Sequence, residues 1–218
     1  MKRFVFGILV LVVTLCCMSL MTWAIEGKET TKRYTVLVLD TSSTSSFLGS
    51  NGREIYRADT AIDYIKKASS RFLENISIAS GDNFVAIVSY KDFATVVSDF
   101  TEDFTLLKNK IDNLGATSTT RSISLGLAYA NELLQNVEED AIKNVVLFTT
   151  GMTNAGDYSY AGQYDENTVG SIWRRTDTQV KLYAYANSAY EQAELLKEKD
   201  IWLYTIGLFQ TMEKMPDE

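Results

Sequence analysis

Residues 33–45 read RYTVLVLDTSSTS, an apolar run that turns polar without a break. The segment VLVL at residues 36–39 predicts a strand that is buried on both faces, as in the centre of a parallel sheet. Asp40, Ser42 and Thr44 follow it at alternate positions. Ligands of open α/β sheets gather beyond the carboxyl ends of the strands, so these three side chains mark a candidate binding site.

The chemistry of this polar segment allows two interpretations. One carboxylate and two hydroxyls are hard oxygen donors of the kind that Mg²⁺ or Mn²⁺ prefers. Asp, Ser and Thr are equally common in turns that cap helices. The segment by itself does not separate a metal site from a capping turn.

The composition is that of a globular protein, with 218 residues, 46% hydrophobic and 22% charged. The net charge is −7, or −9 once Lys2 and Arg3 are removed with the N-terminal segment, which argues against nucleic acid as a partner. The chain has no histidine, and its two cysteines, Cys16 and Cys17, lie in the N-terminal apolar segment. These absences exclude Ser-His and Cys-His nucleophile pairs and most zinc sites.

Residues 1–24 are predicted to be a targeting segment, because Lys2 and Arg3 precede an apolar run over residues 4–21. Cleavage after Ala24 would make it a signal peptide. The run is longer than the usual signal core of about 7–15 residues and approaches the roughly 20 that span a bilayer, so an uncleaved membrane anchor is the alternative. Either way we expect the domain to be extracytoplasmic, secreted or anchored in the membrane, with residues 25–32 as a linker.

Strand and helix patterns alternate along residues 33–218. Buried strands are predicted over residues 36–39, 84–90, 144–149 and 201–209, a further strand over 95–100, and helices over 56–78, 104–114, 123–137 and 180–198. This order predicts an α/β fold, a doubly wound, mostly parallel sheet with helices on both faces. The strands at 84–90 and 95–100 should form one antiparallel hairpin. Residues 151–177 form a long polar excursion, which is either functional or disordered.

The order strand, Asp-x-Ser-x-Thr, helix, hairpin, helix, threonine loop, helix and strand resembles the von Willebrand factor type A (vWA) family over about residues 34–209. The resemblance implies a metal-ion-dependent adhesion site built from three loops at one edge of the sheet. Asp40, Ser42 and Thr44 match the first loop. Thr117, within GATST at residues 115–119, matches the ligand of the second loop.

The third loop departs from the family pattern. Residues 149–151 read TTG where the family reads Thr-Asp-Gly, so Thr150 stands in the aspartate's place. Asp40 is then the one carboxylate among the matched positions, and the affinity for a cation should fall. Because Mg²⁺ keeps several waters and needs only one or two protein carboxylates, we expect weakened binding of Mg²⁺ or Mn²⁺. Asp157 is a candidate substitute carboxylate, and a degenerate site without metal is the alternative.

The resemblance implies a protein-binding, adhesion-type module whose Mg²⁺ accepts an acidic side chain of a partner. In the long loop, Asp157, Tyr158, Tyr160 and Tyr164 are candidates for ligand binding, since aromatic residues dominate interface hot spots. The tyrosines could instead pin the loop onto its own domain. The alternative function is a metal-independent scaffold for assembly at a membrane or cell surface.

Enzymatic activity is not expected. Phosphoryl transfer through Asp40 would need a second aspartate two positions later, where Ser42 stands, and the chain has no Walker loop. Only residues 210–218 follow the last predicted strand. We therefore expect either that the terminal helix that the vWA family usually adds is trimmed, or that the chain is a truncated version of something longer.

Overall fold

The computed structural model describes residues 31–42, 47–48, 54–55, 61–118, 120–169, 171–173 and 179–208, with the side chains of 47–48, 54–55, 171–173 and 179–180 left out. The predicted targeting segment, residues 25–30 of the linker, Thr44 and the chain after residue 208 lie outside this set. No helix within the set is both long and apolar enough to cross a bilayer. The fold belongs to the unit Lys32–Glu218.

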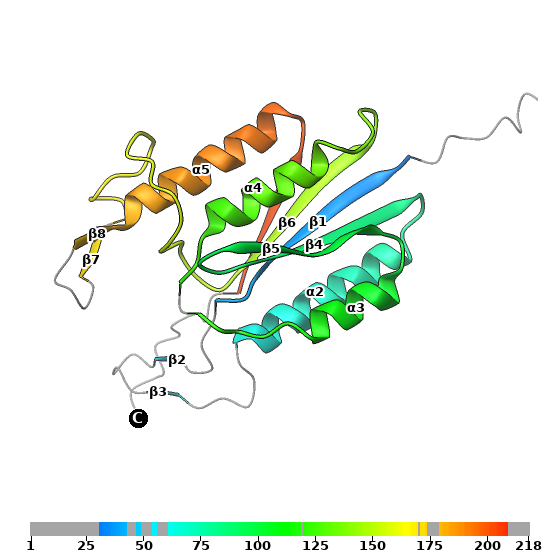
Figure 1. The fold of residues 1–218 in the computed structure, drawn as a ribbon, viewed down its shortest axis with the longest axis horizontal. Helices are drawn as coiled ribbons and strands as arrows, with labels where there is room; N and C mark the ends of the chain where they lie inside the picture. Colours follow the sequence, from blue (N-terminus) through cyan, green and yellow to red (C-terminus); the bar gives the residue numbers. More distant parts are fainter. Residues whose placement is uncertain are drawn as a thin grey trace, which may run out of the picture. The chain divides into compact units, whose positions relative to one another are not determined.

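A five-stranded sheet runs in the order β5-β4-β1-β6-β9 (Figure 1). Its strands are β1 (Arg33–Asp40), β4 (Asn83–Tyr90), β5 (Ala94–Thr101), β6 (Ile142–Thr149) and β9 (Trp202–Gly207). The central β1 pairs in parallel with β4 and β6, β9 pairs in parallel with β6, and β5 pairs antiparallel with β4. The predicted mostly parallel sheet with one antiparallel hairpin is confirmed.

Two helices cover each face of the sheet. One face carries α2 (Ala61–Ser77) and α3 (Phe104–Asp112), and the other carries α4 (Ile123–Leu134) and α5 (Leu182–Glu198) (Figure 1). These are the four predicted helices, with ends that differ by a few residues. The start of α3 follows from its cap, because the Asp103 carboxylate accepts a hydrogen bond from Leu106 N at 2.9 Å.

The side chains of β1 alternate between two cores, which explains its unbroken apolar run. Val38 packs into the cluster that contains Leu127 of α4, whereas Leu39 packs into the cluster that contains Ile65 of α2. A strand between two helical layers must be apolar at every position. Because β1 is packed from both sides, its last residue, Asp40, is held in a fixed position at the edge of the sheet.

The prediction of a buried strand over residues 201–209 is wrong about its burial. Ile201 is buried, but Trp202 is 65% exposed and Tyr204 is 52% exposed. β9 stands at the end of the strand order with β6 as its neighbour, while Leu203 and Ile206 reach the two cores. An apolar run shows that a strand forms, but it does not distinguish a central strand from an edge strand.

Two short antiparallel pairs were not predicted. β2 (Phe47–Leu48) pairs with β3 (Glu54–Ile55), and β7 (Ser171–Trp173) pairs with β8 (Gln179–Lys181). Strands of two or three residues are too short to show a period-2 pattern. The pair of β7 and β8 lies at the end of the long excursion and leads directly into α5.

Candidate functional site

Asp40 is the last residue of β1, and its side chain is completely buried. Ser42 N donates a hydrogen bond to Asp40 Oδ1 at 2.9 Å, and the Ser42 hydroxyl donates to the same oxygen. These bonds fold the chain back on the carboxylate in an Asx-type turn. The structure thus brings together the first two residues of the predicted first loop.

Thr150 satisfies the other oxygen of Asp40. Thr150 N and Thr150 Oγ1 donate hydrogen bonds to Asp40 Oδ2 at 2.9 and 2.7 Å. β1 and β6 are parallel neighbours, so their carboxyl ends meet at one edge of the sheet. The predicted first and third loops therefore share the Asp40 carboxylate.

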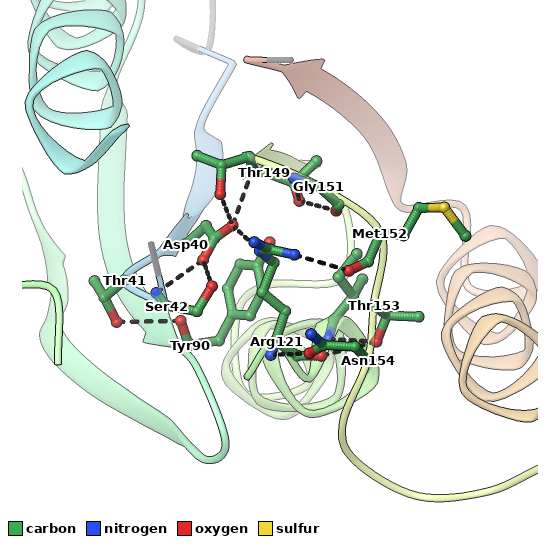
Figure 2. Close-up of polar contacts among 12 residues, drawn as sticks. Asp40, Thr41, Ser42, Tyr90, Arg121, Thr149, Gly151, Met152, Thr153 and Asn154 are labelled. Carbon is green, nitrogen blue, oxygen red and sulfur yellow. Dashed lines mark hydrogen bonds and ion pairs between the residues drawn. The ribbon is translucent and has the colours of Figure 1, made fainter. Parts of the chain in front are cut away.

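The positive charge beside Asp40 comes from Arg121, a residue that was not among the predicted site residues. Arg121 Nε lies 3.3 Å from Asp40 Oδ2, and Arg121 Nη1 donates a hydrogen bond to the Met152 carbonyl oxygen at 3.2 Å. Figure 2 shows the guanidinium between the Asp40 carboxylate and Met152. The Nε atom is buried without a hydrogen bond of good geometry, and the side chain as a whole is 21% exposed.

The backbone of Arg121 is clamped by the loop that follows β6. Arg121 N donates to Asn154 Oδ1 at 2.6 Å, and the Arg121 carbonyl accepts from Asn154 N and Ala155 N, each at 3.0 Å (Figure 2). Gly151 leaves the space for the guanidinium, because a Cβ at that position would lie 2.7 Å from Arg121 Nη1. The third loop thus positions Arg121 in two ways. It forms hydrogen bonds to the Arg121 backbone, and the glycine at position 151 leaves room for the guanidinium.

Thr117, the predicted ligand in the second loop, contacts a lysine. Lys91 Nζ donates a hydrogen bond to Thr117 Oγ1 at 2.6 Å and lies 4.4 Å from the centre of the Phe93 ring. Lys91 follows β4, and its carbonyl oxygen accepts from Ser122 N at 2.6 Å, next to Arg121. A second cation therefore belongs to the same group of loops.

Tyr90 adds a buried phenol near this site. Its hydroxyl donates a hydrogen bond to the Phe148 carbonyl oxygen at 3.2 Å, and the side chain is fully buried. Burial, followed by the negative charge of Asp40, raises the pKa of Tyr90 well above its usual range. The phenol stays protonated and acts as a donor, so it supplies no negative charge for a cation.

The described residues do not fit a divalent ion as they lie. Asp40 already accepts bonds from Ser42 and Thr150, and its charge is paired with Arg121. Hydroxyl groups can exchange a bond to a carboxylate for a bond to a metal, but the guanidinium keeps its charge and repels a cation. Within the described part of the chain, no three His, Cys, Asp or Glu side chains gather to hold a metal. Thr44 is outside that part.

The loop tyrosines lie against α5. The Tyr158 ring stacks on the Tyr185 ring at 4.6 Å with their hydroxyls 2.8 Å apart, and the Tyr160 ring is parallel to that of Tyr158 at 5.9 Å. Tyr164 N donates to Asn187 Oδ1 at 3.0 Å. These contacts attach the loop to its own domain, while Tyr158 and Tyr160 remain 53% and 64% exposed.

Asp157 does not take part in the Asp40 cluster as described. Its side chain is exposed, and among the residues that the structure describes no hydrogen bond or ion pair joins it to Asp40, Thr150 or Arg121. The role of Asp157 as a substitute carboxylate stays a prediction.

Comparison with solved structures supports the same fold. The D319A mutant of the PilB minor pilin from Streptococcus sanguinis is similar at 19% identity with a TM-score of 0.60, over 84% of this chain and 52% of that one. The vWF domain of the type V pili tip protein Mfa5 from Porphyromonas gingivalis is similar at 16% identity with a TM-score of 0.56, over 82% and 81%. This chain thus spans about half the length of the PilB structure.

A third solved structure carries a metal. Proximal thread matrix protein 1 from the mussel byssus, with a zinc-occupied MIDAS motif, is similar at 18% identity with a TM-score of 0.52, over 82% of this chain and 36% of that one. At these identities the likenesses show the fold alone. No curated protein matches the chain.

A family model described as "von Willebrand factor type A domain" matches residues 35–153, more than half of the chain. The match begins in β1, includes Asp40 and Arg121, and ends in the loop that clamps Arg121. The topology, the Asp-x-Ser turn and this match agree with one another. The chain belongs to the von Willebrand factor type A domain family.

Proposed function

We propose that this chain is an extracytoplasmic protein-binding module of the adhesion or assembly type, which engages its partner through the loops around Asp40. Membership of the vWA family supports protein binding rather than catalysis. The fold relatives include a minor pilin and a pilus tip protein, both components of surface structures. The predicted targeting segment at residues 1–24 agrees with that location.

Of the two versions that the sequence leaves open, we favour binding without a divalent ion. The observation that carries this choice is the ion pair between Asp40 and Arg121, 3.3 Å apart. It neutralises the buried carboxylate from within the chain. In the version that depends on Mg²⁺, Arg121 would have to leave before the ion could enter.

Titration calorimetry tests whether the chain binds a divalent metal ion. MgCl₂ and MnCl₂ are titrated into the full chain in detergent, with Asp40→Asn as the control. We expect the heats of the two proteins to match. Saturable binding at millimolar concentration or below, lost in Asp40→Asn, would contradict metal independence and restore the Mg²⁺-dependent site.

Site-specific photo-crosslinking tests the proposed binding face. A photoreactive residue replaces Met152, which is 54% exposed beside Arg121, or Ile78, which is 84% exposed after the end of α2. We expect cross-linked protein adducts on the producing cells from position 152 and not from position 78. Equal yields at both positions would contradict a partner at the sheet edge.

A further inference from the structure

The two edge strands of the sheet, β5 and β9, differ in how they are protected against pairing with a further strand. β5 carries the exposed Asp99, and its pairing with β4 is irregular between Val85 and Val88. Charges and irregularities of this kind keep an edge strand from pairing with another chain. β9 reads WLYTIG, with no charge and no proline, and it pairs with β6 in unbroken register. The edge at β9 therefore lacks the protection that β5 has.

The outer side of β9 presents backbone donors and acceptors. Leu208 N donates a hydrogen bond to the Thr149 carbonyl oxygen at 2.8 Å, so the backbone of Leu208 points at β6. Backbone groups of a strand point alternately to its two sides, so Tyr204, four positions earlier, also points at β6, whereas Leu203 and Thr205 point away from it. Within the residues that the structure describes, no second strand pairs with β9.

Two large aromatic side chains lie beside this edge. Trp202, Tyr204 and Ile206 share one face of β9, because side chains alternate along a strand. Ile206 packs into the cluster that contains Ile65 of α2, but Trp202 is 65% exposed and Tyr204 is 52% exposed. The helical layer on this face thus leaves both rings uncovered. Exposed aromatic rings next to an edge strand are typical of a protein–protein contact.

We propose that β9 pairs antiparallel with β9 of a second copy of this chain, which joins two five-stranded sheets into one. Two-fold symmetry places the strand opposite itself, so any charge on it would meet the same charge on the other copy. β9 has no charge to repel its own copy, although the chain as a whole carries a net charge of −7. The same pairing through β5 would bring Asp99 towards Asp99 of the second copy. This contact goes beyond the proposed function, because it does not use the loops around Asp40.

The strand determines how the two copies align. Residues that face each other in an antiparallel pair lie on the same face of the sheet, and a two-fold axis at Tyr204 meets this condition. Leu203 and Thr205 of the second copy then exchange backbone hydrogen bonds, and Trp202 lies opposite Ile206 of the second copy. The two Tyr204 residues take a non-hydrogen-bonded position, where side chains approach most closely.

The size of the contact indicates a weak dimer. An aromatic side chain buries about 150–250 Å² in full, so the exposed parts of Trp202 and Tyr204 from both copies supply roughly 500 Å². Stable complexes bury at least about 1,200 Å². We therefore expect association that rises with protein concentration and a monomer in dilute solution.

Disulfide cross-linking of the full chain in detergent tests the pairing. Cys16 and Cys17 are replaced by serine, and one cysteine is introduced by Tyr204→Cys, Trp202→Cys or Val96→Cys. In the proposed alignment the two copies of position 204 lie with their Cα atoms about 4.5 Å apart, within reach of a disulfide. The two copies of position 202 are displaced by four residues, about 13 Å along the strand, which is too far.

We expect a covalent dimer from Tyr204→Cys under copper-phenanthroline oxidation, with a yield that rises with protein concentration, and little from the other two variants. Trp202→Cys is the matched control, because position 202 is more exposed than position 204 and random collisions would favour it. Val96→Cys is the control for the other edge of the sheet.

A charge exchange at Tyr204 provides the second measurement, by sedimentation at several protein concentrations. Tyr204→Lys and Tyr204→Glu should each weaken self-association at least about fivefold, because like charges then face each other. An equimolar mixture of these two variants should restore association. Val96→Lys adds the same charge at β5 and should change nothing.

Three results would overturn the proposal. A Tyr204→Cys chain that gives no covalent dimer would show that another segment or another protein occupies the edge, and equal yields from positions 202 and 204 would show collision without a defined alignment. Failure of the mixed Lys and Glu variants to associate would exclude an axis at Tyr204. Each of these results leaves the proposed binding face around Asp40 unaffected.

Discussion

At the scale of single residues, the site depends on how a buried carboxylate is neutralised. Asp40 has no exposed surface, and an uncompensated charge in such a place costs several kcal/mol. Four hydrogen bonds from Ser42 and Thr150 and the charge of Arg121 together offset that cost. Thr150 is therefore a donor to Asp40 here, whereas an aspartate at this position would add a second negative charge.

This charge balance predicts a gain of metal binding from two substitutions. Arg121→Ser removes the guanidinium that is paired with Asp40, and Thr150→Asp supplies a second carboxylate. The site would then offer the oxygen donors that Mn²⁺ requires. We expect saturable Mn²⁺ binding by calorimetry in the millimolar range or tighter, and none in the parent chain.

The matched control adds Asp40→Asn to the double variant, which should abolish the gained binding. Circular dichroism checks that each variant keeps its helical content. A folded double variant that binds no Mn²⁺ would show that something other than Arg121 and Thr150 keeps metal out of the site.

At the scale of elements, the edge of the sheet is assembled from segments that the parallel strands align. β1 and β6 run side by side with Leu39 paired to Phe148, so Asp40 and Thr150 meet although they are 110 positions apart. The same strand pair is joined at its other end by an ion pair between Lys32, just before β1, and Glu138, just before β6, at 2.5 Å.

The pair at that far end has a pH dependence of its own. Hydrogen bonds from Lys32 and then Tyr34 lower the pKa of Glu138 from 4.5 to about 2. Because the folded pKa is depressed, the stabilising contribution of Glu138 is present above pH 4.5 and is lost as the pH falls towards 2. We expect an NMR titration of the Glu138 carboxyl to give a midpoint near 2.

Lys32→Gln removes the largest cause of this shift, so the midpoint of Glu138 should move back towards 4.5 in that variant. Glu139, the adjacent exposed carboxylate, serves as the internal reference in the same spectra. A midpoint for Glu138 that is the same in both proteins would contradict the role of Lys32.

At the scale of the whole domain, the central strands of the sheet are buried more deeply than the edge strand β9. The central strands lie between α2 and α3 on one face and α4 and α5 on the other (Figure 1). At the edge, β9 leaves Trp202 and Tyr204 more than half exposed, while Phe148 of the adjacent β6 is fully buried. Stability should therefore depend on β6 far more than on the exposed side of β9.

Two side-chain substitutions compare how much β6 and β9 contribute to the free energy of unfolding. Phe148→Ala opens a cavity in the core and should lower the free energy of unfolding by about 3–5 kcal/mol. Trp202→Ser removes a larger side chain from an exposed position and should cost less than about 1 kcal/mol. Urea unfolding followed by circular dichroism compares them, and equal losses would mean that the exposed side of Trp202 is covered in solution.

The sequence alone was sufficient for the order of the five sheet strands and the four helices, the antiparallel hairpin and the family, because hydrophobic periodicity and the Asp-x-Ser turn are local properties of the chain. The four strands of two or three residues, β2, β3, β7 and β8, are too short to show that periodicity. The sequence also pointed to Asp40, Ser42 and Thr150, since the ends of parallel strands meet at one edge. It missed the exposure of Trp202, because an apolar run reads the same in a central strand and in an edge strand.

The cation that neutralises Asp40 was decided by the tertiary structure. A lone arginine after a threonine-rich loop carries no periodic signal, and the residues next to Arg121 in the sequence do not predict its pairing with Asp40. Its position depends on the clamp by Asn154, on the space left by Gly151 and on the packing of α4 against the sheet. Electrostatic pairing of buried groups depends on distance in three dimensions, and only folding brings these residues within reach of one another.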